Sequence, residues 1–207
     1  MFHVPGDWSE LLAVSKTQPA EAVARLADAG QVAFGENYVQ EAEGKIRALA
    51  GRGLEWHLIG HLQSNKCREA AAAFDWVQSL DRPKLVAELD RHRGPGLERL
   101  NILIQVNPDA EAGKSGCAPE AVAGLARLVA SAPRLRLRGL MAIPEPTPDP
   151  AQRRAAFARM AQLFSGLRAH HAGVDTLSMG MSDDYALAIA EGATMVRIGT
   201  ALFGARG

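Results

Sequence analysis

The feature that most constrains the fold of this chain is a regular alternation between short aliphatic runs and longer, alanine-rich amphipathic segments. The short runs are apolar on both faces, which is typical of parallel strands that helices cover on both sides. Eight runs are predicted to be strands: Leu11–Ser15, Val32–Gly35, Trp56–Gly60, Trp76–Leu80, Asn101–Val106, Leu137–Ala142, Thr176–Met179 and Met195–Ile198. The segments predicted to be helices lie near 19–31, 38–50, 65–73, 82–93, 119–132, 151–171 and 183–191.

Strands that alternate with helices in this way predict an α/β fold, and within that class a single-domain TIM (β/α)8 barrel. Repeats of about 25 residues place the 207-residue chain near the short end of that fold's range. A doubly wound open sheet is the alternative, but eight complete repeats favour closure. The proline-rich stretch 144–150 is too short for a linker, so residues 1–207 are expected to form one domain. No segment after Ile198 is long enough for a full eighth helix.

The charge balance limits the partners of this chain. Its 23 basic and 23 acidic side chains cancel, so neither nucleic acid nor an anionic membrane surface is an expected partner.

No apolar run approaches the roughly 20 residues of a membrane span, and the first residues do not resemble a signal peptide, which predicts a cytoplasmic protein. Cys67 and Cys117 lack metal-ligand spacing, so two free thiols and no metal site are expected.

The five lysines are few enough to consider individually. Lys16 closes the first predicted strand, at the end where barrels build their sites, and a partly desolvated amine there can form an imine with an aldehyde. The alternative is an ordinary lysine that extends its ammonium into solvent. Lys45 and Lys84 fall inside amphipathic helices and are expected to be solvated, whereas Lys66 and Lys114 could contact an anion at the rim.

The last two strands carry a second group of polar residues. Arg197 lies between aliphatic residues of strand eight, and a guanidinium there is costly to bury unless it meets an anion or an acceptor. It could therefore belong to a structural ion pair or contact a ligand. Gly199 and Thr200 follow it, and Ser178 begins a small-residue segment after strand seven. Loops after strands seven and eight form the recurrent phosphate site of TIM barrels, which predicts such a site here.

Six motifs along the chain together resemble one known family. They are Ala13-Val-Ser-Lys-Thr, Phe34-Gly-Glu-Asn-Tyr-Val-Gln-Glu, Trp56-His-Leu-Ile-Gly-His-Leu-Gln-Ser-Asn-Lys, Gly139-Leu-Met-Ala-Ile, Ser178-Met-Gly-Met-Ser-Asp-Asp and Met195-Val-Arg-Ile-Gly-Thr-Ala-Leu-Phe-Gly. This combination is similar to that of the YggS/PROSC family of pyridoxal phosphate homeostasis proteins. The resemblance implies a barrel like the N-terminal domain of alanine racemase, which binds pyridoxal 5′-phosphate (PLP), has no established catalytic activity and serves vitamin B6 balance.

The resemblance also implies a role for single residues. Lys16 would hold PLP as a Schiff base, and Arg197 would face the pyridine nitrogen. The implied phosphate cradle consists of Ser178, Gly199 and Thr200, and the residues beside the ring are Asn37 and Met179. The polar residues around the third strand receive no fixed role; they are His57, His61, Gln63, Asn65 and Lys66. PLP-dependent apo-enzymes are the implied recipients of the cofactor, and a monomer is implied rather than a dimer.

The chain departs from the family pattern at its start. Members usually carry a helix before the first strand, whereas here only about ten residues, with Pro5 and Gly6 among them, precede Leu11. A barrel lacking this helix is expected to have a groove beside strands one and eight, with the outward positions Leu12, Val14, Val196 and Ile198. Residues 1–10, the tail 201–207 or a second subunit would cover that apolar surface. A cover by the two termini is favoured, with Trp8 as the principal side chain that fills the groove.

Three functions are compatible with these residues. An arginine opposite the pyridine nitrogen keeps that nitrogen unprotonated and weakens the ring as an electron sink, which favours a non-catalytic carrier of PLP. A small PLP-dependent amino-acid racemase is the alternative, with Tyr185 near the strand-seven loop as its candidate acid or base. The third hypothesis is a barrel enzyme for phosphorylated metabolites in which Lys16 is an ordinary charge.

Overall fold

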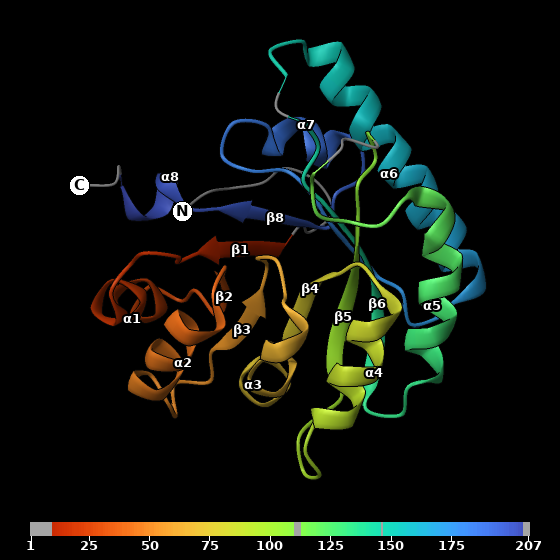
Figure 1. The fold of residues 1–207 in the computed structure, drawn as a ribbon. Helices are drawn as coiled ribbons and strands as arrows, with labels where there is room; N and C mark the ends of the chain where they lie inside the picture. Colours follow the sequence, from red (N-terminus) through yellow and green to blue (C-terminus); the bar gives the residue numbers. More distant parts are fainter. Residues whose placement is uncertain (1–9, 110–112, 146, 205–207) are drawn as a thin grey trace.

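A computed structural model describes residues 10–109, 113–145 and 147–204 of the chain. Eight strands, all paired in parallel, close into a barrel in chain order (Figure 1). They are β1 (Glu10–Val14), β2 (Ala33–Glu36), β3 (Glu55–Leu58), β4 (Trp76–Leu80), β5 (Leu100–Val106), β6 (Leu135–Ala142), β7 (Thr176–Ser178) and β8 (Met195–Ile198). The predicted TIM barrel is confirmed, and the open-sheet alternative is wrong.

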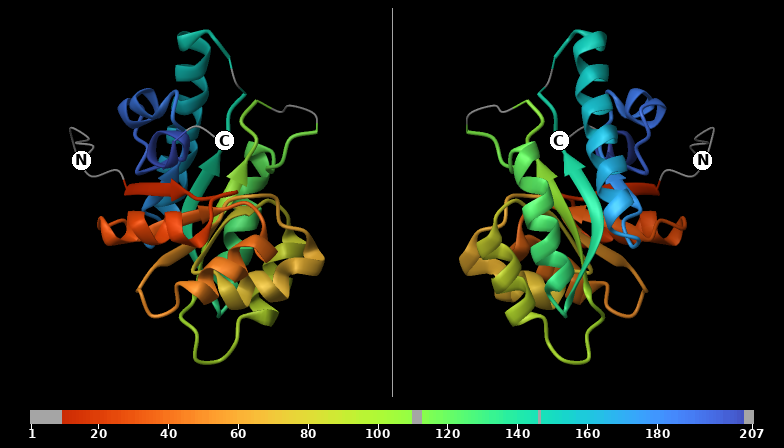
Figure 2. Two further views of the ribbon diagram at one scale, coloured as in Figure 1. Left: turned by 90° about the vertical axis from the view of Figure 1, so that its left-hand side faces the viewer. Right: turned by 90° about the vertical axis from the view of Figure 1, so that its right-hand side faces the viewer.

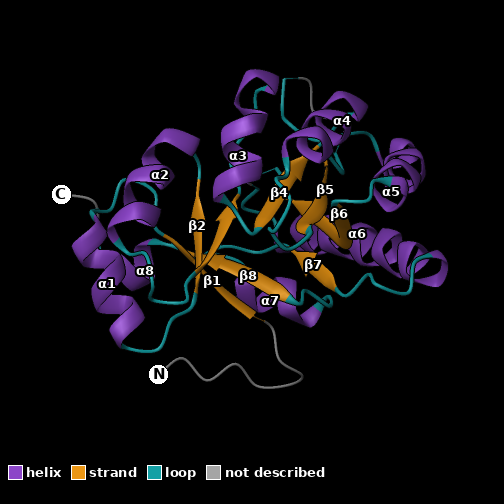
Figure 3. Ribbon diagram, turned by 90° about the horizontal axis from the view of Figure 1, so that it is seen from below, coloured by secondary structure: helices purple, strands orange, loops and turns teal. Residues whose placement is uncertain are grey.

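In the view from below, helices lie outside the strands on several sides (Figure 3). Those described are α1 (Ala20–Asp28), α2 (Val39–Ala48), α3 (Cys67–Ala73), α4 (Pro83–His92), α5 (Val122–Ser131), α6 (Pro150–His170), α7 (Tyr185–Ala190) and α8 (Thr200–Phe203), with 3-10 turns η1 (Ser64–Lys66) and η2 (Pro119–Ala121). The helix described after β8 is the four-residue α8. Within the described ranges, no helix is both long and apolar enough to cross a membrane.

Two apolar regions stabilise the barrel. The larger one lies between the strands and the helices, where buried residues from every strand contribute to one contiguous cluster. The interior holds smaller clusters, one built by Leu12, Ala33 and Met195 and another by Trp76 with Leu103 and Met141. Side chains of a strand alternate between these two regions because successive residues point to opposite faces.

A glycine in β6 allows two strands to approach closely. Gly139 has φ +153°, and a Cβ at this position would lie 1.8 Å from the carbonyl oxygen of Thr176. The pairing of β6 with β5 also shifts its register, between Ile102 and Leu103. The absence of a side chain at the first position of the Gly139-Leu-Met-Ala-Ile motif therefore has a structural reason.

The predicted orientation of β1 is wrong by one residue. Leu12 is buried inside the barrel, and Val14 faces the cavity described below, whereas Ala13 packs outward. A shift of one residue moves every side chain of a strand to the other face. Val196 and Ile198 do point outward and are buried. The predicted covers lie mostly outside the described residues: Trp8 and the rest of residues 1–9, and the tail 205–207.

The side views show where the barrel is extended beyond its strands (Figure 2). The first turns of α6 rise on the side toward which β5 and β6 run. Asp149 caps this helix by accepting a hydrogen bond from the Ala151 amide at 2.9 Å, and Pro150 occupies its first turn. The loops that follow the strands on this side carry the motifs singled out in the sequence.

Candidate functional site

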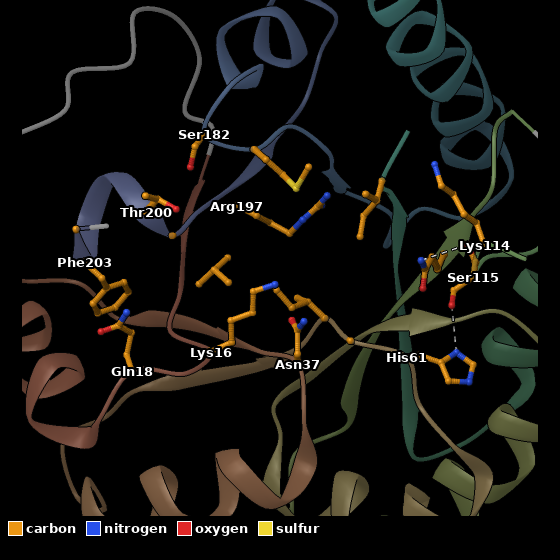
Figure 4. A pocket seen from close by; sticks show the side chains of 18 residues that line it. Lys16, Gln18, Asn37, His61, Lys114, Ser115, Ser182, Arg197, Thr200 and Phe203 are labelled. Carbon is orange, nitrogen blue, oxygen red and sulfur yellow. Dashed lines mark hydrogen bonds between the residues drawn. The ribbon is translucent and has the colours of Figure 1, made fainter. Parts of the chain in front are cut away.

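A cavity of about 490 Å³ opens at the carboxyl ends of the strands. Figure 4 shows Lys16, Asn37 and Arg197 near its centre, with Thr200, Phe203 and Gln18 on one side and His61, Ser115 and Lys114 on the other. The lining residues come from β1, β5, β8, α8 and the loops that follow the strands: Val14, Lys16, Gln18, Asn37, Ile59, Gly60, His61, Gln105, Lys114, Ser115, Ile143, Met181, Ser182, Arg197, Gly199, Thr200, Phe203 and Gly204. Five of the seven predicted site residues therefore meet in one cavity.

Lys16 follows β1 by two residues and is half-buried in the cavity wall. Among the described residues, none forms a hydrogen bond or an ion pair with its ammonium group. Its amine is thus held at the cavity by its backbone rather than by a salt bridge.

The backbone around Lys16 is fixed by a buried ionic network. The Ser15 hydroxyl donates to Glu36 at 2.5 Å, and Lys45 Nζ donates to both the same Glu36 oxygen and the Ser15 carbonyl at 2.7 Å. Glu41 accepts hydrogen bonds from Lys45 and from the Thr17 amide. The residues on either side of Lys16 are therefore bonded to α2 and to the end of β2.

The prediction that Lys45 is solvated is wrong, while Lys84 is exposed as expected. Lys45 lies in α2, and its side chain is only 7% exposed because it reaches inward to the completely buried Glu36. Burial raises the pKa of Glu36, and the hydrogen bonds from Lys45 and Ser15 oppose that shift. Helix periodicity alone places Lys45 beside solvent and does not reveal a carboxylate at the end of the neighbouring strand.

Arg197 in β8 is buried, with its guanidinium at the floor of the cavity. It donates to the Ser178 hydroxyl at 2.7 Å and to the Ala142 carbonyl at 2.8 Å, which are neutral acceptors. Within the described ranges no carboxylate forms an ion pair with it. Burial lowers its pKa to about 10, so Arg197 carries a positive charge at neutral pH. Its guanidinium can therefore bind an anion or a further hydrogen-bond acceptor in the cavity.

The predicted phosphate cradle is only partly assembled around the cavity. Gly199 and Thr200 line it, at the start of α8, together with Ser182 from the loop after β7. Ser178 does not line it, because its hydroxyl is buried and bonded to Gln78 and Arg197. Met179 is buried as well and lies outside the lining. Ser182 belongs to the same motif as Ser178 but is not among the residues predicted from the sequence. The motif has two serines, and only the second lies beyond the end of β7.

Asn37 reaches the cavity directly after β2, next to the loop that follows β3. Gly60 in that loop packs against it so closely that a Cβ there would lie 2.1 Å from the Asn37 carbonyl oxygen. Only glycine allows this approach, which explains the position of Gly60 in the third motif.

The polar residues of the third motif fall into different places. His61 lines the cavity and contacts the Ser115 hydroxyl at 3.3 Å through Nδ1. Gln63 and Asn65 are exposed, and Lys66 forms an ion pair of 3.7 Å with Glu69. His57 is completely buried inside the barrel, where it contacts Gln78.

The two cysteines are free and buried. Burial raises the pKa of each thiol to about 11, so both are protonated and unreactive at neutral pH. Among the described residues, no group of three or more potential metal ligands is found. The prediction of two free thiols is confirmed.

The barrel, with a lysine after β1 and a buried arginine in β8, defines this chain as an alanine-racemase-type barrel. The family described as "Alanine racemase, N-terminal domain" matches residues 3–207. The pyridoxal phosphate homeostasis protein of Pseudomonas aeruginosa is 58% identical over 196 residues, which cover 95% of this chain and 84% of the relative. That of Escherichia coli is 53% identical over 199 residues, which cover 95% and 85%. The chain belongs to the YggS/PROSC family of pyridoxal phosphate homeostasis proteins.

Solved structures agree with this assignment. PipY of Synechococcus elongatus, solved with PLP bound, is 40% identical to this chain and superposes with a TM-score of 0.86 over 95% of this chain and 92% of that one. Alanine racemase from Corynebacterium glutamicum matches 94% of this chain but 55% of its own, with a TM-score of 0.70 and 19% identity. That second likeness shows a shared barrel fold alone.

Proposed function

We propose that this chain is a PLP-binding protein of cofactor homeostasis that buffers or delivers PLP and does not catalyse a reaction. The observation that carries the proposal is the meeting of Lys16, Arg197 and the Gly199–Thr200 turn in one cavity. The relatives named for PLP homeostasis and the PLP-bound PipY structure support it.

The residues present fit this cofactor. PLP supplies an aldehyde that condenses with amines, a ring nitrogen that accepts a hydrogen bond and an anionic phosphate. Lys16 would hold it covalently, and the buried guanidinium of Arg197 would donate a hydrogen bond to the ring nitrogen. Ser182, Gly199 and Thr200 would surround the phosphate. Asn37 would lie beside the ring, whereas Ser178 would act through Arg197.

A carrier is favoured over an amino-acid racemase by the lining of the cavity. Racemases of this fold use a tyrosine as partner of the lysine, but of the two tyrosines of this chain, Tyr38 is 64% exposed and Tyr185 packs against the core cluster. Neither lines the cavity. The buried free thiols fit a cytoplasmic protein. PLP-dependent apo-enzymes would be the recipients, and a monomer would suffice for this role.

A spectroscopic experiment tests the attachment to Lys16. The protein mixed with PLP should gain an absorption band near the edge of the visible range that borohydride removes, and Lys16→Ala should lack this band while keeping its melting temperature within about 3 °C, because a half-buried strand-end charge contributes little stability. Lys66→Ala is the matched control and should keep the band. Covalent retention of the reduced cofactor by Lys16→Ala would contradict the assignment, and a missing band in the unchanged protein would favour the phosphorylated-metabolite hypothesis.

A second experiment separates the carrier from the racemase. The loaded protein is incubated with several amino acids in deuterated water, and exchange of the α-proton is followed by NMR. The carrier hypothesis expects exchange no faster than with free PLP at the same concentration. Enzyme-like exchange that disappears in Tyr185→Phe would establish the racemase instead.

A further inference from the structure

A continuous chain of hydrogen bonds crosses the barrel interior beneath the cavity. Arg197 donates to the Ser178 hydroxyl at 2.7 Å, and that hydroxyl donates to Gln78 Oε1 at 2.7 Å. Gln78 Nε2 lies 2.9 Å from His57 Nδ1, and His57 Nε2 lies 2.8 Å from Glu55 Oε1. The three middle residues are completely buried. The chain therefore links the cavity floor to the amino-terminal start of β3.

The direction of each hydrogen bond follows from the arginine. A guanidinium only donates, so the Ser178 oxygen must accept from Arg197 and use its own proton toward Gln78. Gln78 then accepts through Oε1, and its Nε2 must donate to His57 Nδ1. His57 accordingly carries its proton on Nε2, from which it donates to Glu55.

The surroundings hold this order in place. The His57 ring stacks on Trp76 with centroids 5.0 Å apart and 10° between the planes. Gln78 Nε2 also contacts the Met195 sulfur at 3.1 Å. Burial opposes ionisation of Glu55, but the hydrogen bond from His57 and the charge of Arg138 lower its pKa overall, so an acceptor is present at the end of the chain.

We propose that Gln78 is a positioning residue for Arg197, held in one amide orientation by His57 and acting through the Ser178 hydroxyl. The inference rests on the proposed function, in which Arg197 serves the ring nitrogen of PLP. Gln78 lies on β4, across the barrel from β8, and does not line the cavity. Without its oxygen, the buried Ser178 proton loses its acceptor and the guanidinium loses a fixed partner on one side.

Three variants at neighbouring positions test the proposal by their dissociation constants for PLP. Gln78→Met replaces the amide by an apolar group of similar length and should weaken PLP binding about tenfold, equivalent to about 1.4 kcal/mol. Gln78→Glu keeps an acceptor for Ser178 and should stay within about threefold of the unchanged protein. Ser79→Ala is the matched control, because Ser79 is also buried in β4 but its hydroxyl has no hydrogen-bond partner among the described residues.

A ligand that lacks the ring nitrogen isolates the action on Arg197. With the 1-deaza analogue of PLP, the affinities of Gln78→Met and of the unchanged protein should agree within about twofold, since the guanidinium then meets no acceptor on the ring. An equal tenfold loss with both ligands would assign Gln78 a general structural role and overturn the proposal. So would PLP affinity in Gln78→Met that equals the unchanged protein, or a loss in Gln78→Glu as large as that in Gln78→Met.

The ligand-free protein provides an independent measurement. Nitrogen-15 NMR at pH 8 should find His57 neutral with its proton on Nε2, and in Gln78→Glu the Nδ1 of His57 should gain a proton to meet the new carboxylate. A proton on Nδ1 in the unchanged protein would overturn the inferred order of donors, even if Gln78→Met failed to fold. Failure of the unchanged protein to bind PLP would refute the proposed function, while the NMR measurement would still decide the order of the chain.

Discussion

At the scale of single residues, the two cationic side chains near the centre of the cavity are positioned in different ways. The Arg197 guanidinium itself donates to two acceptors and has no carboxylate partner among the described residues. For Lys16, hydrogen bonds fix the neighbouring residues, and its amine faces the cavity. The sequence predicts both residues because each is unusual for its strand. It does not predict Lys45 or Gln78, because a lone lysine in a helix and a lone glutamine in a strand are recognised as buried only when their partners are known.

Breaking the ion pair between Lys45 and Glu36 is expected to make the free energy of unfolding depend on pH. Lys45→Met should lower the free energy of unfolding by about 3 kcal/mol at pH 8, because a buried carboxylate is left without its cation. Losing Lys45 removes an influence that lowers the Glu36 pKa, so that pKa rises further in the folded state. A group whose pKa is raised on folding binds more protons in the folded state, so the free energy of unfolding falls as pH rises from about 4.5 through the folded pKa.

Chemical denaturation of Lys45→Met at pH 5 and pH 8 measures this effect, and the loss should be smaller at pH 5. The double variant Lys45→Met/Glu36→Gln should lose the added pH dependence, because no carboxylate remains to be ionised. Lys84→Met is the control, since Lys84 is exposed. An equal loss at both pH values would show that Glu36 stays ionised without Lys45.

At the scale of elements, the strands were predictable to within a few residues because aliphatic runs bounded by polar loops coincide with buried strands. The start of β1 differs by a single residue, Glu10 rather than Leu11, and the predicted inward and outward faces of this strand were reversed. Face assignment needs tertiary contacts: Leu12 fills the barrel beside Ala33 and Met195, which are far away in sequence. The same limit applies to Ser178, since the sequence does not tell the last inward position of a strand from the first position of its loop.

The loop between β1 and α1 contains a strained backbone position that can be tested directly. Thr17 has φ +64°, a conformation that costs a residue with a Cβ about 1 kcal/mol, and its amide donates to Glu41. Thr17→Gly should therefore be more stable than Thr17→Ala by about 1 kcal/mol, the reverse of the usual order for an ordinary position. Thermal unfolding of the two variants measures the difference. Because both lack the threonine side chain, an alanine variant as stable as the glycine variant would show that the loop relaxes to another conformation.

At the scale of the whole molecule, the shortest strand closes the barrel beside the proposed phosphate site. β7 has three residues, and its register with β8 consists of the single pair Ser178 and Met195. The Met179 amide also donates to the Met195 carbonyl, and the Arg197 amide donates to the Gly180 carbonyl. We call this short line of pairing between β7 and β8 the seam. The cavity is lined on one side of this seam by Ser182 and on the other by Thr200. A ligand that contacts both loops would therefore stabilise the barrel at the place where pairing is shortest.

This arrangement predicts that PLP protects the seam from opening through its phosphate. At a concentration about 100 times the dissociation constant, PLP should slow hydrogen exchange of the Met179, Thr194 and Arg197 amides by up to about a hundredfold, the limit set by linkage. Pyridoxal at the same concentration should give much less protection, because it lacks the charge-assisted hydrogen bonds to both loops. Amides between β2 and β3 at the opposite ends of the strands, such as that of Glu55, which donates to the Val32 carbonyl and does not line the cavity, provide the internal comparison. Equal protection by pyridoxal and PLP would show that the ring alone holds the seam, and that the turn at Gly199 and Thr200 does not bind a phosphate.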